Sequence, residues 1–223
     1  MFDQLQSFKS NGQFPLDSLH DLLEKVIPCD AASVLFGLIK QGHFTLDEYN
    51  AMMAKTCLQG YEVRDRPRKV KPRSEKLPGK ALSVSLHIRL MPYVIWRLLG
   101  EPEEKIDNKL LDLLGILHTF NDFVHADKVT LADLRNFKDL VVDFFEKRKS
   151  CSTKFAFVRL TPKYHFLEHY PSEVRRFGPL NGYWTARCES KHREFVNFAE
   201  SAKNFINLPK TLAEKHQKLL VSR

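Results

Sequence analysis

Asp17 and His20 are the first residues whose types and spacing could do chemistry. They lie three positions apart, just after Pro15, so in the first turn of a helix their side chains share one face. Such a pair could hold a metal ion or position a carboxylate for proton transfer. Aspartate is also a favoured residue at a helix start, so an N-cap beside an incidental histidine explains the same spacing. Spacing alone leaves both interpretations open.

A second set of residues has the spacing of zinc ligands. His165 and His169 are four positions apart, as are Cys188 and His192, and each pair shares one face of an expected helix. Together they could supply four nitrogen and sulfur ligands to zinc. Phe166 follows His165, so the H-E-x-x-H pattern of metalloproteases is absent. The alternative is helix packing with hydrogen-bonded imidazoles.

Glu189 is a third candidate, on a helix expected to follow a tight turn. The stretch F-G-P-L-N-G-Y-W at 177–184 contains the glycines and proline that such a turn requires. The apolar stripe of the helix leaves Glu189 at its edge, beside Arg193. A carboxylate there could reach an active-site cleft, or it could form a surface ion pair.

Positive charge is concentrated in two parts of the chain. The net charge is +8: residues 61–80 contribute +5 and residues 150–223 contribute +7, while the remaining residues together contribute −4. Basic clusters neutralise phosphates, so these parts are the ones that could face a polyanion such as a nucleic acid. A solvated tether or a nuclear-import signal is the alternative for residues 61–80. The candidate phosphate contacts are Arg64, Arg66, Arg68, Lys69, Lys71 and Arg73, with Arg175, Arg176, Arg187, Lys191 and Arg193 as a second patch.

The composition excludes several classes of protein. No apolar run approaches the ~18 residues of a membrane span, and the first residues lack the profile of a signal peptide. The glycine-rich patterns that cradle nucleotide phosphates are absent, so we expect no nucleotide cofactor. Four scattered cysteines without a C-x-x-C pair indicate a reducing compartment. We therefore expect no membrane partner and a reducing compartment, which is the nucleus if residues 61–80 act as an import signal and otherwise the cytoplasm.

Apolar residues recur at helical spacing along most of the chain, which predicts a mainly α-helical bundle. The expected helices cover residues 16–40 with a break at Pro28, 45–57 behind a capping box, 81–99, 103–123, 131–149, 162–169, 184–205 and 208–220. Residues 155–160 are the one strand-like run, so we expect at most one or two short strands. The expected divisions are an N-terminal helical block at 1–60, a basic linker at 61–80, a helical bundle at 81–150 and a C-terminal helical block at 151–223.

Taken in order, these motifs resemble the C-terminal half of the catalytic region of CACTA-type (En/Spm-like) DDE transposases, as found in transposon-derived animal proteins. The resemblance spans residues 14–220. The matching strings are H-D-L-L-E at 20–24, T-L-D-E at 45–48, L-P-G-K-A at 77–81, L-T-P-K-Y-H at 160–165, F-G-P-L at 177–180, E-S-K-H at 189–192 and N-L-P-K-T-L-A at 207–213. Tyr183 stands where the family has an arginine.

The resemblance implies an RNase H-like core interrupted by a helical insertion, here residues 30–160. It also implies three carboxylates that bind two divalent metal ions, Mg²⁺ or Mn²⁺, for strand cleavage and transfer. Glu189 would be the last of these carboxylates, and Asp17 and His20 would form the D-x-x-H motif that precedes the insertion. Partners implied by the resemblance are DNA, a second copy of the chain, or a full-length transposase.

The first two aspartates of the family lie upstream of the D-x-x-H motif, on strands of the catalytic sheet. Only 16 residues precede Asp17, too few to build those strands. We therefore expect a fragment or a transposon-derived copy that binds DNA but cannot cut it alone. The alternatives are a helical protein-interaction module, and an active nuclease that uses Asp17, Glu189 and either Asp21 or Glu24.

Overall fold

The computed structural model describes residues 15–100, 108–186, 195–201 and 206–221. They divide into two units, one ending at Tyr183 and the other beginning at Trp184. The described chain is mainly helical and contains no strand, which confirms the fold class predicted from the apolar periodicity. None of the described helices combines the length and apolar character that crossing a membrane requires.

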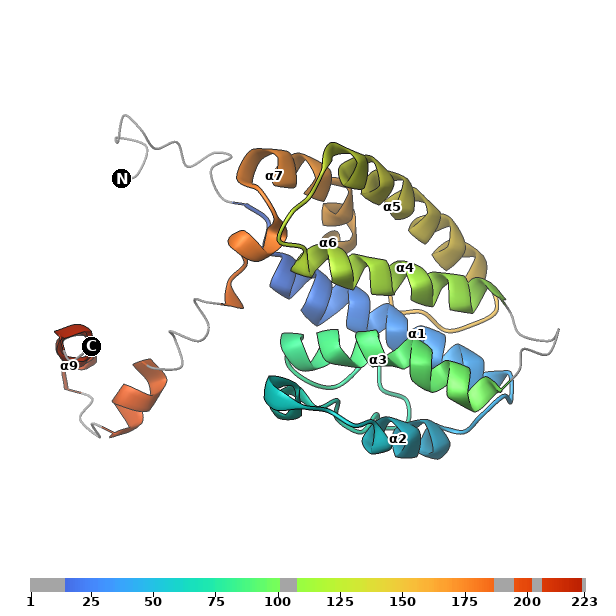
Figure 1. Ribbon diagram of the computed structural model, residues 1–223, viewed down its shortest axis with the longest axis horizontal. Coiled ribbons are helices and arrows are strands. Elements are labelled where there is room, and N and C mark those ends of the chain that lie inside the picture. Colours follow the sequence, from blue (N-terminus) through green and yellow to red (C-terminus); the bar gives the residue numbers. More distant parts are fainter. Residues whose placement is uncertain (1–14, 101–107, 187–194, 202–205, 222–223) are drawn as a thin grey trace. The chain divides into compact units, whose positions relative to one another are not determined.

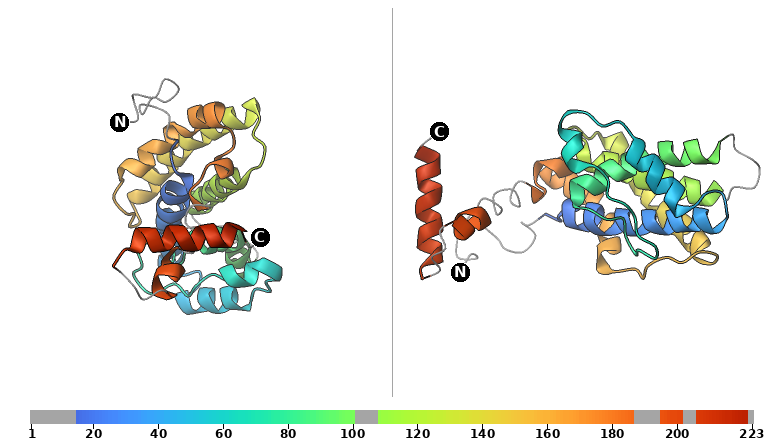
Figure 2. Two further views of the ribbon diagram at one scale, coloured as in Figure 1. Left: turned by 90° about the vertical axis from the view of Figure 1, so that its left-hand side faces the viewer. Right: turned by 90° about the horizontal axis from the view of Figure 1, so that it is seen from below.

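The first unit is built in layers around α1 (Ile27–Lys40). α1, α3 (Ala81–Leu99) and α4 (Asn108–His125) pack against one another, and α5 (Leu131–Ser152) packs on the far side of α4 (Figure 1). α2 (Leu46–Lys55) packs against α3 at the edge opposite α5, and it forms the bottom of the first unit in the end-on view of Figure 2. α3, α4 and α5 run in alternating directions, as expected of an antiparallel bundle.

The core lies where α1 meets its neighbours. Burial of each large aliphatic or aromatic side chain stabilises the fold by about 1.5–3 kcal/mol. Gly37 lets α4 approach closely, because a Cβ atom there would lie 2.9 Å from Cδ1 of Leu110. The fully buried core side chains include Leu22, Leu35, Leu38, Ile88, Leu113, Leu117, Phe120 and Phe144.

The expected break at Pro28 is wrong. η2 (Leu19–Val26), a stretch of π-helix, passes directly into α1, and Pro28 occupies the first turn of that helix. Proline has no N–H to donate, so the first turn of an α-helix tolerates it. Its carbonyl group accepts a hydrogen bond of 2.9 Å from the backbone N–H of Leu77.

Residues 155–160 are not a strand, because no neighbouring strand pairs with them in the described chain. After them come α6 (Pro162–His165), η4 (Phe166–Glu168), α7 (Tyr170–Phe177) and η5 (Leu180–Gly182). These short elements return the chain to η2, which α6 contacts. They therefore bring the end of the first unit next to its beginning.

Residues 61–80 form a loop that lies against the first unit. It begins with η3 (Gly60–Asp65), and Val70 and Leu77 are fully buried. The segments 1–60, 61–80 and 81–150 distinguished in the sequence thus belong, as far as they are described, to one compact unit with 151–183.

The second unit pairs two helical stretches, residues 195–201 and α9 (Leu208–Val221). Nζ of Lys215 donates hydrogen bonds to the carbonyl oxygen of Phe198 at 3.2 Å and to Oγ of Ser201 at 2.8 Å. The rings of Phe195 and His216 meet edge to face, 5.4 Å apart. α9 therefore packs on the preceding helix.

Candidate functional site

Asp17 and His20 come together at the start of η2, as their spacing predicts. Nδ1 of His20 contacts Oδ2 of Asp17, and Oδ1 of Asp17 accepts a hydrogen bond of 3.2 Å from the N–H of Leu19. Nε2 of His20 lies 3.9 Å from a carboxylate oxygen of Glu24, one turn later. Asp17 thus caps the helix and orients a half-exposed imidazole at the same time.

Asp21, next to this pair, is buried. Its carboxylate accepts a hydrogen bond of 3.2 Å from the hydroxyl of Tyr170 and lies 3.5 Å from Nζ of Lys163. Lys163 also donates to the carbonyl oxygen of His20 at 2.8 Å. Burial raises the pKa of the Asp21 carboxyl, and the positive charge of Lys163 opposes that rise. The carboxylate of Asp21 therefore lies inside the unit, where Tyr170 and Lys163 are its partners.

Glu173 completes this region. Its carboxylate accepts a hydrogen bond of 3.2 Å from the N–H of Leu16. We call the six side chains together the N-terminal polar cluster, which consists of Asp17, His20, Asp21, Lys163, Tyr170 and Glu173. Lys163 lies on α6 and Tyr170 begins α7, so the two side chains come from different helices. Their meeting with η2, across more than 140 positions, had no local signal.

The described chain contains no group of three or more histidine, cysteine, aspartate or glutamate side chains arranged to hold a metal ion. Glu189, Cys188 and His192 lie outside the described residues, so the predicted catalytic and zinc-binding sets stay predictions. His165 and His169, the other half of the predicted zinc set, face each other with 3.0 Å between their Nε2 atoms. Both are exposed; His165 is the last residue of α6, and His169 lies between η4 and α7.

The basic segment, defined here as residues 64–73, is held in place by a buried amide. Nδ2 of Asn50, on α2, donates to the carbonyl oxygen of Val70 at 3.0 Å, and Oδ1 accepts from the N–H of Val70 at 2.9 Å. Arg66 donates to the carbonyl oxygens of Ala54 and Thr56, at 3.1 and 3.3 Å, and so caps the end of α2. The backbone of the segment is thereby fixed against α2.

The basic side chains of this segment are accessible to solvent. Arg64, Arg66, Arg68, Lys69, Lys71 and Arg73 are all exposed. Between the segment and α2 lies a groove of about 290 Å³, whose lining includes Asn50, Arg66, Arg68 and Lys69. Asp47 is the one acidic residue of that lining, and it lies 3.5 Å from Lys69. A bound anion would meet a surface that is predominantly positive.

Of the predicted second patch, Arg175 and Arg176 are exposed in the last turn of α7, and the guanidinium of Arg176 lies 4.9 Å from the ring centroid of Phe177. Arg187, Lys191 and Arg193 lie outside the described residues. α7 and α2 occupy opposite edges of the first unit (Figure 1). Arg175 and Arg176 therefore form a surface separate from the basic segment.

In comparisons with known proteins, no family model, curated protein or solved structure matches the chain.

Proposed function

We propose that this chain is a transposase-like, transposon-derived protein that binds DNA through its basic segment and does not cut DNA by itself. The observation that carries the proposal is the exposed row of arginines and lysines on a backbone fixed by Asn50. No acidic residue interrupts positions 66–73. A preordered cationic surface loses less conformational entropy on binding a polyanion than a flexible tether does.

We propose that the chain does not cleave DNA because its candidate carboxylates, Asp17 and Asp21, already have other partners. Asp17 caps η2, and Asp21 is buried against Lys163 and Tyr170. A two-metal site needs several carboxylate oxygens that converge on ions ~3.5–4 Å apart. Asp21 would have to leave its buried partners to contribute, which supports binding without cleavage.

The test is a titration of labelled duplex DNA with the full chain at two salt concentrations, with Mg²⁺ present and nicked products scored. Affinity should fall steeply with salt, because each neutralised phosphate releases counterions. The double variant Arg68→Glu/Lys71→Glu should weaken binding and lower the logarithmic salt slope by about 2. The matched control is Arg135→Glu/Lys138→Glu, which makes the same charge change on the exposed face of α5.

Equal losses in the two double variants would remove the basic segment from the proposal. Metal-dependent nicking that is abolished by Glu189→Ala would show a working catalytic site and contradict the proposed lack of cleavage.

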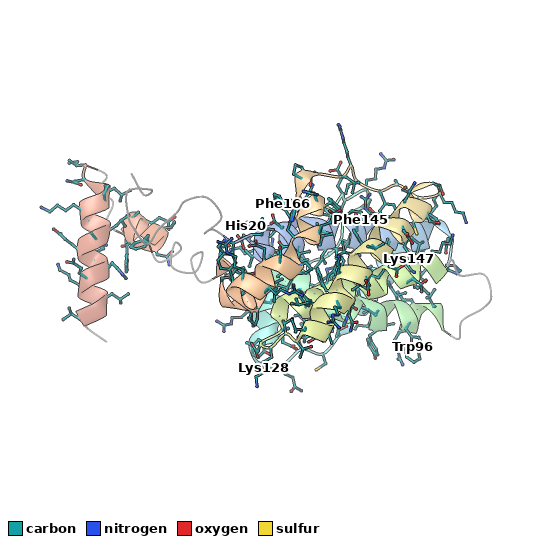
Figure 3. The ribbon with its side chains drawn as sticks, turned by 90° about the horizontal axis from the view of Figure 1, so that it is seen from above. His20, Trp96, Lys128, Phe145, Lys147 and Phe166 are labelled. Carbon is teal, nitrogen blue, oxygen red and sulfur yellow. The ribbon has the colours of Figure 1, made fainter. Side chains whose placement is uncertain are left out.

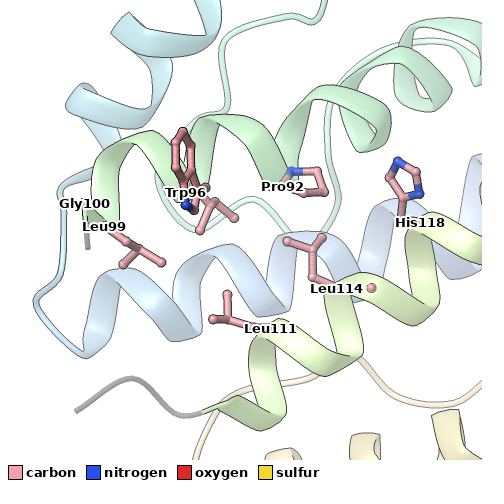
Figure 4. Close-up of a pocket in the computed structure, with 9 residues that line it drawn as sticks. Pro92, Trp96, Leu99, Gly100, Leu111, Leu114 and His118 are labelled. Atoms are coloured by element: carbon pink, nitrogen blue, oxygen red, sulfur yellow. The ribbon is translucent and has the colours of Figure 1, made fainter. Parts of the chain in front are cut away.

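A helical protein-interaction module is the second candidate, favoured by one observation. An apolar groove of about 520 Å³ opens between α3 and α4 (Figure 4). Leu99, Leu111 and Leu114 line it, with the exposed Trp96 at its edge. Apolar surface of this kind often marks an interaction site. A chain that binds no DNA at low salt would favour this second function.

A further inference from the structure

The outer face of α3 carries aromatic side chains that are left in water. Tyr93 is 53% exposed and Trp96 is 61% exposed, and Tyr61, in the neighbouring η3, is 72% exposed. Burial of a large aromatic ring against a partner is energetically favourable, so a group of exposed rings on a surface marks a binding site.

Arginines alternate with these rings. Arg89, Tyr93 and Arg97 are spaced four positions apart on α3, and Trp96 lies between the last two, so all four share one helix face. Each of the four is exposed. α3 contains no aspartate or glutamate from Ala81 to Leu99. The face is thus aromatic and carries the positive charge of Arg97, whereas the charge of Arg89 is balanced by Glu62.

This face is continuous with the basic segment. Arg89 forms an ion pair with Glu62, and Oγ of Ser83 donates a hydrogen bond of 3.3 Å to the carbonyl oxygen of Arg66. Residues 62–66 therefore run along α3 in the opposite direction, from the level of Arg89 to that of Ser83. With a helical rise of about 1.5 Å per residue, the span from Ser83 to Arg97 is about 21 Å.

An apolar recess extends the face beyond Trp96. Figure 4 shows Trp96 and Pro92 on α3 across from Leu111 and Leu114 on α4. Figure 3 places Trp96 at the end of the unit away from His20, so this surface is distinct from the N-terminal polar cluster.

We infer that the face formed by Tyr61, Arg89, Tyr93, Trp96 and Arg97 binds unpaired bases, so that the nucleic acid held by the basic segment is single-stranded. This inference rests on the proposed function. In a duplex the base faces are covered by stacking, whereas unpaired bases offer them to aromatic side chains. Arg97 and the basic segment would contact the phosphates of the same strand.

Intrinsic fluorescence tests the stacking directly. The chain has two tryptophans, so Trp184→Phe leaves Trp96 as the sole indole emitter. Oligodeoxythymidine added to this full-length variant should quench the emission of Trp96, because stacking places a base against its ring. Fluorescence anisotropy of a labelled oligomer shows in parallel whether binding saturates. The inference would be overturned if binding saturates while the Trp96 emission stays unchanged, and if the variant Tyr93→Ala/Trp96→Ala also binds with unchanged affinity.

Affinity separates this inference from the function on which it rests. Tyr93→Ala/Trp96→Ala should weaken binding of labelled oligodeoxythymidine about tenfold or more and leave duplex binding nearly unchanged. The matched control is Val142→Ala/Leu160→Ala, which truncates two exposed side chains that are not aromatic.

Three outcomes are distinguishable. Selective loss of single-strand binding in Tyr93→Ala/Trp96→Ala supports the inference. The titration is made with oligodeoxythymidine and with oligouridine, and the oligomer that the chain binds identifies DNA or RNA as the source of the strand. Unchanged single-strand binding in that variant, with weaker binding by Arg68→Glu/Lys71→Glu, overturns the inference and leaves the proposed function standing. A chain that binds neither single strands nor duplexes contradicts both.

Discussion

Arg148 on α5 and Asp30 on α1 form a two-pronged ion pair inside the first unit, 118 positions apart in the sequence. Nε of Arg148 donates to one carboxylate oxygen at 2.7 Å, and a terminal nitrogen donates to the other at 3.3 Å. The hydroxyl of Tyr164 adds a bond of 2.9 Å to Asp30, and Arg148 also donates to the carbonyl oxygen of Val158 at 2.6 Å. The pair therefore ties α1, α5 and the chain between α5 and α6 together.

Removing one partner of this pair should be strongly destabilising. Arg148→Met leaves the Asp30 carboxylate buried without its counter-charge, and we expect a loss of about 3–5 kcal/mol in the free energy of unfolding. Urea denaturation followed by circular dichroism measures it. The double variant Asp30→Leu/Arg148→Met should lose less than the single one, because no buried charge remains. Arg135→Met, on the exposed face of the same helix, is the control and should stay within about 0.5 kcal/mol.

His87 should make the first unit sensitive to mild acid. It is buried on α3 with Nε2 2.9 Å from the hydroxyl of Tyr49, and burial lowers its pKa from 6.5 to about 4. The unfolded chain therefore takes up a proton below pH 6.5 that the folded chain takes up only near pH 4. The contribution of His87 to stability is complete above pH 6.5 and is lost as the pH falls toward 4, by up to about 3 kcal/mol. Partial burial lowers the pKa of His125 as well, which acts in the same direction.

The check is chemical denaturation of the wild type and of His87→Gln across pH 4 to 7.5. The variant can still hydrogen-bond to Tyr49 but cannot titrate, so its stability should fall less over this range. A variant with the same pH dependence as the wild type would assign the acid sensitivity to other groups.

Asp21 should change the stability with pH in the direction opposite to His87. Burial raises the pKa of its carboxyl in the folded chain above the ordinary value of 3.8, so the folded chain binds the proton more tightly than the unfolded chain does. Stability due to this group is present at low pH and is lost as the pH rises through the raised pKa. Asp21→Asn should therefore gain stability over the wild type between pH 4 and pH 7, as measured by urea midpoints. Asp139→Asn, an exposed substitution on α5, is the matched control.

Asn50 should control the order of the basic segment. Asn50→Ala removes both hydrogen bonds to Val70 and leaves its main-chain groups without their partner, at a cost of about 1–3 kcal/mol. We expect faster tryptic cleavage at Arg68, Lys69 and Lys71, followed by mass spectrometry, and weaker binding of anionic polymers. Asn136→Ala, exposed on α5, should change neither. Unaltered cleavage in Asn50→Ala would mean that Val70 is held by packing alone.

Local signals predicted the parts of this fold that depend on neighbouring residues. α3 has the predicted bounds, and the capping box at Thr45 and Glu48 starts α2 with both reciprocal hydrogen bonds. The contact of Asp17 with His20 likewise follows from their three-residue spacing. Each of these features is decided within one or two turns of helix.

Features that depend on distant residues were not predictable from such signals. The π-helical turn before Pro28 and the coil at 155–160 depend on what packs around them, which overrides local propensity. Nothing near Asp30 in the sequence indicates Arg148 as its partner, and nothing near Asp21 indicates Lys163. The sequence of residues 61–80 suggested a flexible linker, whereas the two hydrogen bonds between Asn50 and the main chain of Val70 hold this segment against α2. In each case the deciding group lies across the unit.

The hydrogen bond from Leu16 to Glu173 spans 157 positions, and Asp21 and Tyr170 meet beside it, so the two ends of the first unit lie side by side. A unit with adjacent ends tolerates circular permutation, because its ends can be joined and new ones opened between exposed residues such as Asp127 and Lys128. Adjacent ends also let such a unit be carried as a single cassette within a loop of a host protein, since entry and exit need only one gap in the host chain.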